Sequence, residues 1–308
     1  MRIGINGSSL IALASPLEEV AAHAAEAERD GFAHYWMAQL LWPDALTAIA
    51  AIGARTTTIR FGTAVVPTWP RHPLMLAAQA LTVSHVLGGR LTLGIGLAHA
   101  TTVQDTFGMP FDSPAEHMAE YLDVLLPAME VHAVDARGEH WSGHTDGFGV
   151  PPEVEAPSVV LAAMGPRMLE LAGSRTDGSV LWLSGPRTIE TRIRPALHAA
   201  AQKVGRPEPQ VVASVPVCVT EDRDKVHDMV ATVLAGYNEL PSYRSVMDTE
   251  HADGPADVSL IGSEAEVRAG LESFASAGTT EFSALEFPSD DHEAAATRSL
   301  LREFDRAG

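Results

Sequence analysis

The chain has 308 residues, 46% of them hydrophobic and 20% charged, which excludes a disordered or membrane-spanning protein. Its formal net charge of −19 at pH 7, with no basic stripe to offset it, argues against nucleic acid or an anionic membrane as a partner. A single cysteine, Cys218, cannot form an internal disulfide, and the N-terminus lacks the apolar region of a signal peptide, so we expect a cytoplasmic protein.

Short apolar runs alternate with amphipathic helical segments from one end of the chain to the other. This alternation predicts an α/β protein, a (β/α)₈ TIM barrel forming a single domain over residues 1–308, with functional loops at the C-terminal strand ends. An open doubly wound sheet is the alternative, but no G-x-G-x-x-G motif follows any strand. The expected strands are Arg2–Asn6, Ala33–Ala38, Ile59–Val66, Leu91–Ile95, Val159–Ala163, Ser179–Leu183, Gln210–Val219 and Glu281–Phe287.

Two segments interrupt this alternation. Residues 134–157 are rich in glycine and proline and predict a hairpin followed by a loop. Residues 237–259 are polar and contain Pro241, Gly254 and Pro255, which predicts a mobile insertion over the barrel mouth. Strands and helices continue on both sides of each segment, so neither is a linker between domains.

One tripeptide occurs twice directly after a predicted strand, as Gly165-Pro166-Arg167 and as Gly185-Pro186-Arg187. Glycine lets the backbone approach a ligand, and proline suits the first position of a helix, where its missing N–H is not needed. The free N–H groups of such a helix start favour an anion, so both turns are candidate phosphate or cofactor cradles. The same residues would also serve as plain helix starts, and the sequence leaves these two interpretations open.

Other candidate residues also follow the predicted strands. His99 comes after the fourth strand, where it could titrate near neutral pH or hydrogen-bond a ring, or be a loop residue without a role. His72, beside Arg71, could act in catalysis or cap a helix. Trp42 and Trp69 could line the binding site of a flat ring or a substrate, or they could pack in the core. The 13 histidines are scattered and neither H-E-x-x-H nor paired cysteines occur, so no metal site is expected.

Six stretches of the chain match a known family: Ala25–Trp36, Thr56–Pro73, Gly88–Gly96, Phe107–Pro110, Glu120–Leu122 and Leu161–Gly185. Through these stretches the chain resembles the luciferase-like flavin-monooxygenase superfamily, and within it the branch that uses coenzyme F420, a deazaflavin. The resemblance covers most of the first two hundred residues.

This resemblance implies a flavin-type ring across the barrel mouth. It places the phosphate at the turn after the fifth strand and implies a bulge on the third strand with a cis peptide between Ala64 and Val65. The implied cofactor-binding residues are Thr63, Ala64, Val65, Ala163, Met164, Gly165, Pro166, Arg167, Ser184 and Gly185. We expect Ser8, Trp42 and Trp69 to line the substrate pocket.

The activity implied by the resemblance is hydride transfer between the C5 atom of coenzyme F420 and a small organic substrate. His99, His72 and Gln39 are the catalytic candidates, although Gln39 stands where many relatives have histidine and cannot shuttle a proton at neutral pH. Arg71, Arg167 and Arg187 are the cations available for the anionic tail of the cofactor. A homodimer or higher homo-oligomer is also implied.

Two other functions stay open. The first is an FMN-dependent monooxygenase of the same fold, because FMN and coenzyme F420 share a ribityl-phosphate portion that one turn cannot distinguish. The second is a non-catalytic flavin-binding protein, which the presence of glutamine at Gln39 would allow.

Overall fold

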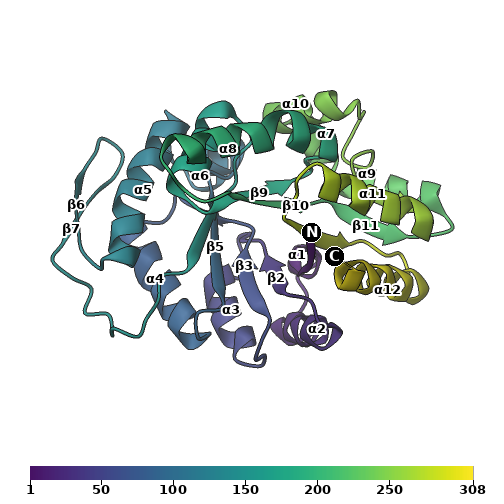
Figure 1. Cartoon of the computed structure of the whole chain (residues 1–308), viewed down its shortest axis with the longest axis horizontal. Coiled ribbons are helices and arrows are strands. Elements are labelled where there is room, and N and C mark those ends of the chain that lie inside the picture. Colours follow the sequence, from purple (N-terminus) through teal and green to yellow (C-terminus); the bar gives the residue numbers. More distant parts are fainter. Residues whose placement is uncertain (308) are drawn as a thin grey trace.

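The chain forms a closed barrel of eight parallel strands surrounded by helices (Figure 1), in a computed structural model that describes residues 1–307. The first and last strands pair, with Arg2 opposite Glu281, and this pairing closes the barrel. The predicted TIM barrel is confirmed. In spatial order the strands are β1 (Arg2–Asn6), β2 (His34–Met37), β3 (Arg60–Thr63), β5 (Leu91–Gly96), β8 (Ser158–Leu161), β9 (Gly178–Trp182), β10 (Gln210–Ser214) and β13 (Glu281–Glu286).

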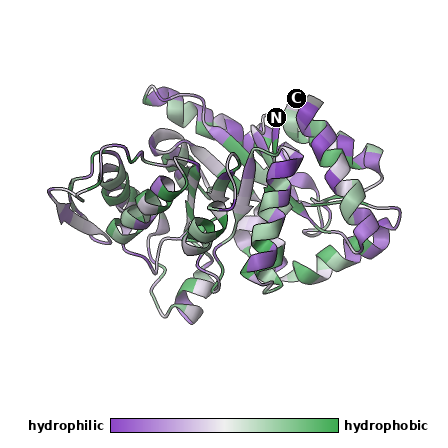
Figure 2. Ribbon diagram, turned by 90° about the horizontal axis from the view of Figure 1, so that it is seen from below, coloured by the Kyte–Doolittle hydropathy of each residue, from purple (hydrophilic) through white to green (hydrophobic). Residues whose placement is uncertain are grey.

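Amphipathic helices cover the outside of the barrel, and polar and apolar residues alternate along their ribbons (Figure 2). Local signals set their ends: the Asp44 side chain accepts from the Thr47 N–H at the start of α3, and Gly31 ends α2 at φ 96°. The main helices are α2 (Leu17–Asp30), α3 (Ala45–Gly53), α4 (Pro73–Val86), α5 (Pro114–Glu130), α6 (Pro166–Arg175), α8 (Arg194–Lys203), α11 (Glu264–Ser276) and α12 (Asp291–Ala307).

The barrel interior is filled by side chains from alternating strand positions. Trp36, Val160, Val180 and Val212 form one buried apolar cluster there. Trp36 donates its indole N–H to Glu281 at 2.6 Å, so the buried carboxylate of Glu281 has a partner inside the barrel. The interior is therefore a packed core, and ligands must bind at the ends of the strands.

Residues 134–157 contain the predicted hairpin, formed by β6 (Val134–Arg137) and β7 (Ser142–Thr145). An isolated two-stranded hairpin is at best marginally stable, so it needs anchors on the rest of the fold. Glu120 of α5 supplies one by accepting from the backbone N–H groups of residues 139–141 at 2.6–3.1 Å. Trp141 supplies the other by donating its indole N–H to His117 Nδ1 at 3.1 Å.

The insertion at 237–259 is largely helical. It follows α9 (Arg223–Val233) and contains η3 (Ala235–Glu239) and α10 (Pro241–Glu250) before β12 (Leu260–Gly262). Tyr243 and Met247 of α10 form a small buried cluster with Leu183 at the end of β9. The polar composition hid this helix, although Leu240, Tyr243 and Met247 have helical spacing.

The remaining short elements lie in the connections. The predicted strand Gln210–Val219 is divided at Val215 into β10 and β11 (Pro216–Val219). No helix within residues 1–307 combines the length and apolar character needed to cross a membrane. The other elements are α1 (Ser8–Ala12), β4 (Val66–Pro67), η1 (Thr102–Thr106), α7 (Pro186–Thr188) and η2 (Ile189–Ile193).

Candidate functional site

A floor of small side chains lies where β3 ends at the barrel mouth. The peptide bond between Ala64 and Val65 is cis, as the resemblance implied, and both residues are half-buried. Ala162, which follows β8, packs with them against the cluster of Trp36, Val160, Val180 and Val212. The floor is apolar and made of small side chains, which suits the face of a flat ring.

Two glycines of β5 make this floor possible. A Cβ on Gly94 would lie 1.9 Å from the Thr63 carbonyl oxygen, and a Cβ on Gly96 would lie 2.7 Å from Val65 Cγ2 and 3.0 Å from Ala162. Thr63 itself is fully buried; its hydroxyl donates to the Gly94 carbonyl at 2.7 Å and accepts from the Gly94 N–H at 2.9 Å. Thr63 therefore attaches the β3 end to β5, and its side chain does not face the mouth.

The turn after β8 is an open helix start. Gly165 and Pro166 are exposed, and no side chain caps α6. Within residues 1–307 the N–H groups of Arg167 and Met168 have no hydrogen-bond acceptor. A Cβ on Gly165 would meet no atom within 4 Å, so the space above the turn is free. Of the neighbouring predicted residues, Ala163 is buried and Met164 packs against the insertion cluster.

The turn after β9 already holds an anion from the chain itself. Glu250, the last residue of α10, accepts from the N–H of Thr188 at 2.6 Å and from the N–H of Arg187 at 3.3 Å. Its carboxyl carbon lies 2.5 Å from the position a Cβ on Gly185 would take. Ser184 and Gly185 are both buried beneath this contact. Of the two similar turns, only the one at Gly165 is open.

Two of the three candidate arginines are paired with carboxylates. Arg71 lies 2.5 Å from Asp44, and Arg167 forms an exposed ion pair with Glu116. Arg187 is exposed and forms no ion pair within the part of the chain that is described. Any anionic tail at the mouth would therefore meet one unpaired cation and two that must exchange partners.

His99 is half-buried beside the aromatic rings of the insertion. Its ring lies edge-on to Tyr237 and Tyr243, at centroid distances of 5.9 and 5.8 Å. Burial lowers the pKa of His99, so the imidazole is neutral at pH 7. Its side chain makes no hydrogen bond within residues 1–307, which leaves its nitrogen atoms free for a ligand.

The other two catalytic candidates are engaged in local structure. The Gln39 amide donates to the carbonyl groups of Leu40 and Pro43, and its oxygen accepts from the Ala45 N–H at 2.8 Å. His72 Nδ1 accepts from the Leu74 N–H at 3.2 Å and caps α4. Both side chains hold loops or helix ends at the mouth.

The three candidate pocket residues lie in different surroundings. Ser8 is half-buried, and its hydroxyl accepts from the Ala38 N–H at 2.9 Å. Trp42 is 56% exposed, whereas Trp69 is buried and its indole N–H has no partner in residues 1–307. The hydroxyl of Ser184 is likewise buried and unpartnered. Unpartnered buried donors are rare in folded proteins, and a ligand or water bound at the mouth would give these two a partner.

One residue near the mouth has no signal in the sequence. His117 lies in the middle of α5, is 1% exposed, and stacks on Trp69 with ring centroids 3.7 Å apart. Because Trp141 donates to Nδ1, the proton must be on Nε2, which lies 2.9 Å from the Thr68 hydroxyl. Burial, together with the nearby His140, lowers the pKa of His117 to about 4. His117 thus fixes the position of Trp69 in its neutral form.

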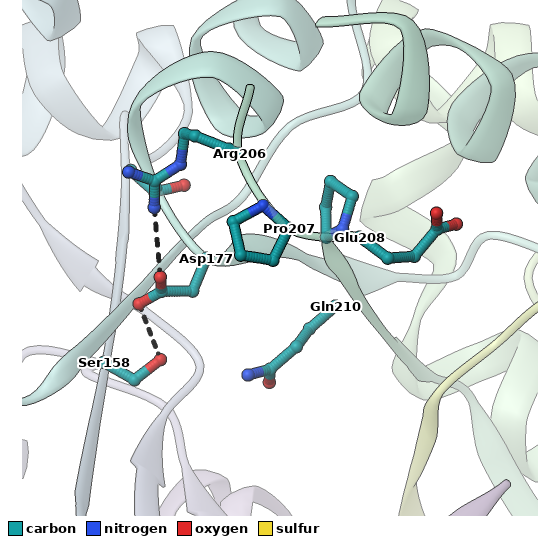
Figure 3. A pocket seen from close by; sticks show the side chains of 8 residues that line it. Ser158, Asp177, Arg206, Pro207, Glu208 and Gln210 are labelled. Atoms are coloured by element: carbon teal, nitrogen blue, oxygen red, sulfur yellow. Dashed lines mark hydrogen bonds and ion pairs between the residues drawn. The ribbon is translucent and has the colours of Figure 1, made fainter. Parts of the chain in front are cut away.

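A cavity of about 340 Å³ lies at the opposite end of the barrel (Figure 3). Ser158, Asp177 and Gln210, at or beside the first residues of their strands, line it together with Arg206. Asp177 accepts from the Ser158 hydroxyl at 2.8 Å and pairs with Arg206 at 3.1 Å, so these polar groups satisfy one another. In TIM barrels the N-terminal end serves stability and the C-terminal end carries the active site, so we place the candidate site at the mouth.

The barrel and the mouth together define a class of protein, the α/β-barrel enzymes. Residues 4–286 match the luciferase-like monooxygenase family, and the chain belongs to that family. Membership makes the protein an oxidoreductase. Within residues 1–307 no group of three or more histidine, cysteine or acidic side chains could hold a metal ion.

Two curated relatives match about three quarters or more of this chain. A Mycobacterium tuberculosis protein named as a coenzyme F420-dependent oxidoreductase is 28% identical over 80% of this chain and 73% of its own length. The 5,10-methylenetetrahydromethanopterin reductase of Methanopyrus kandleri is 26% identical over 75% of this chain and 72% of its own.

Solved structures share the fold. The coenzyme F420-dependent tetrahydromethanopterin reductase of Methanopyrus kandleri superposes with a TM-score of 0.82 at 20% identity, covering 99% of this chain and 98% of its own. The oxygenating constituent of the 3,6-diketocamphane monooxygenase of Pseudomonas putida, in complex with FMN, gives 0.77 at 16% identity, covering 98% and 97%.

Proposed function

We propose that the protein transfers a hydride between coenzyme F420 and a small organic substrate at the barrel mouth. The observation that carries the proposal is the open helix start at Gly165 beside the floor of Ala64, Val65 and Ala162. A helix start with free N–H groups binds a phosphate, and a flat apolar floor accepts a ring system. The name of the Mycobacterium tuberculosis relative, a coenzyme F420-dependent oxidoreductase, supports the deazaflavin over FMN.

The residues at the mouth fit the parts of such a cofactor. The N–H groups of Arg167 and Met168 would hold the phosphate, the floor would hold the ring, and Arg187 would meet the anionic tail. Bound coenzyme F420 would supply hydride chemistry at its C5 atom. The barrel contributes orientation and the exclusion of water from the reacting atoms.

His99 is the side chain we propose for proton handling. It is the one candidate among His99, Gln39 and His72 whose side chain makes no hydrogen bond to the chain. Because its pKa is lowered by burial, it is neutral at pH 7 and would accept a proton from a substrate hydroxyl or hydrogen-bond a carbonyl.

The second candidate function is an FMN-dependent monooxygenase. It is favoured by the ion pairs of Arg71 with Asp44 and of Arg167 with Glu116, which leave little free positive charge for the tail that FMN lacks. The two functions differ in their need for oxygen. An anaerobic assay of reduced coenzyme F420 with enones and imines, beside an oxygen-uptake assay with reduced FMN, separates them. Substrate-dependent oxidation of the deazaflavin without oxygen supports the proposal, and oxygen-dependent turnover of FMN alone refutes it.

We also propose that the protein is a cytoplasmic homodimer that pairs through α3 and α4, which pack side by side (Figure 1). Of the helices of eight or more residues within 1–307, these two alone carry no aspartate, glutamate, lysine or arginine. Met75 and Val86 on the outer side of α4 are 57% and 52% exposed. In a two-fold dimer the same surface of both subunits meets at the interface. Because the chain has a net charge of −19, a surface without charged residues avoids repulsion between the two subunits.

Light scattering tests the dimer. The double substitution Met75→Glu with Val86→Glu should give a monomer, whereas Val233→Glu, at an equally exposed site on α9, should leave the dimer intact. A monomeric wild-type protein, or a dimer that survives the double substitution, would contradict the assignment.

A further inference from the structure

Four of the nine large apolar side chains that are exposed in residues 1–307, including the two most exposed, lie in two loops at the mouth. Leu13 and Leu41 are 77% and 74% exposed, and Trp42 and Leu40 are 56% and 48% exposed. Leu13 follows α1 in the loop after β1, and the other three lie in the loop after β2. We call these four side chains the apolar rim. Single exposed apolar residues are ordinary, but four of them on two adjoining loops indicate a binding surface.

The apolar rim lies beside the floor of the candidate site. β1 pairs with β2, and β2 pairs with β3, which leads into Ala64 and Val65. The hydrogen bond from the Ala38 N–H to the Ser8 hydroxyl, at 2.9 Å, connects the two loops that carry the rim. A molecule bound on the rim is therefore next to the ring floor.

The rim is held in a fixed shape by Gln39. This side chain bonds to the backbone at Leu40 and Pro43 on one side and at Ala45 on the other, spanning the whole loop. Because three backbone groups of the loop are bonded to one side chain, the loop presents Leu40, Leu41 and Trp42 with less entropy to lose on binding. Gln39 acts here as a positioning residue for the rim.

The rim also lacks charge. No aspartate, glutamate, lysine or arginine occurs in residues 3–17 or 31–43, in a chain that has 40 acidic and 21 basic residues. Asp44, the next residue after this stretch, is paired with Arg71, so a charged ligand placed there would lose hydration and would have to break that pair to gain an ionic partner. An uncharged hydrocarbon would lose no hydrogen bond and would bury apolar area.

We propose that the apolar rim binds the substrate, and that the substrate is an uncharged molecule with an extended hydrocarbon portion. The reacting group would lie over the floor at Ala64 and Val65, and the hydrocarbon portion along Leu13, Leu41 and Trp42. The inference rests on the proposed function for the reaction but concerns binding, so it can be tested without turnover.

Straight-chain 2-alkanones of increasing length are suitable probes, with fatty carboxylates of the same lengths for comparison. Burying one CH₂ group strengthens binding by up to about fourfold, so the ketones should bind more tightly with each added carbon. The carboxylates should bind at least about tenfold more weakly, because their charge has no partner on the rim. Equal affinity for short and long ketones, or for ketones and carboxylates, would overturn the proposal.

Two variants assign the effect to the rim. Leu41→Ser, or Leu13→Ser if the first does not fold, should remove most of the chain-length dependence, whereas Val233→Ser on α9 should leave it unchanged. Unchanged ketone binding in both rim variants would overturn the proposal. So would a change from dimer to monomer in Leu41→Ser, because the rim would then be covered by a second copy.

Titrating the same variants with coenzyme F420 and FMN separates this inference from the proposed function. Failure to bind either cofactor while ketone binding persists would count against the proposed function alone. Normal cofactor binding without chain-length dependence would count against the rim alone.

Discussion

Replacing Gly165 by alanine separates a ligand cradle from a plain helix start. Gly165 has φ −85° and ψ 156°, which alanine adopts freely, and a new Cβ would meet nothing within 4 Å. Losing glycine restricts the unfolded chain, which stabilises the fold by about 0.4–1 kcal/mol. Alanine is a poorer N-cap than glycine by about 0.5–1 kcal/mol. The two effects nearly cancel, so the free energy of unfolding should change by less than about 0.5 kcal/mol.

Cofactor binding should respond much more strongly to Gly165→Ala. The added methyl group would stand where a phosphate approaches the N–H groups of Arg167 and Met168, and losing one hydrogen bond to a charged group costs about 1.5–3 kcal/mol. The dissociation constant should rise about 10- to 150-fold. Urea unfolding and fluorescence titration measure the two quantities, with Gly147→Ala, in the loop after the hairpin, as control. Wild-type affinity in stable Gly165→Ala would refute the cradle and leave the turn as a helix start.

Three further predictions concern the structure around the mouth. Gly94→Ala places its Cβ 1.9 Å from the Thr63 carbonyl, so it should cost at least about 1–3 kcal/mol in urea unfolding; an unaltered midpoint would contradict this. Arg298→Met leaves the buried carboxylate of Glu286 without its guanidinium partner, and thermal or urea unfolding should show a loss of about 3–5 kcal/mol; a loss under 1 kcal/mol would show that Glu286 is solvated. His117 has its pKa lowered from 6.5 to about 4, so the folded state binds fewer protons than the unfolded state between these values. Stability should therefore fall as the pH decreases through this window, and His117→Gln should remove that part of the slope.

The barrel was predictable because short runs rich in apolar residues alternate with helical segments, most of which have an amphipathic repeat. Those local patterns specify the type and order of the elements. Eight strand–helix units in succession are typical of a parallel sheet that closes into a barrel. The hairpin was predictable for a similar reason, since glycine and proline mark its turn and its exit. The helix α10 was missed because most of its exposed residues are polar. Its buried residues, Tyr243, Val246 and Met247, were interpreted as part of a loop.

The site was less predictable because it depends on contacts between distant segments. The turns at Gly165 and Gly185 are alike in sequence, yet only one is open, because Glu250 lies 62 residues beyond Thr188 and reaches back to it. Likewise, nothing near His117 in the sequence indicates Trp141 or Trp69 as its neighbours. Gln39 was identified as a departure from the family pattern, but its bonds to its own loop became visible only in three dimensions.

Parallel titration of the purified protein with coenzyme F420 and with FMN, followed by the fluorescence of its five tryptophans, tests the central proposal most directly. The proposal predicts that the deazaflavin binds more tightly than FMN, and that the difference shrinks as salt screens Arg187 from the anionic tail. Tighter binding of FMN would contradict it and make the protein a monooxygenase of the same fold.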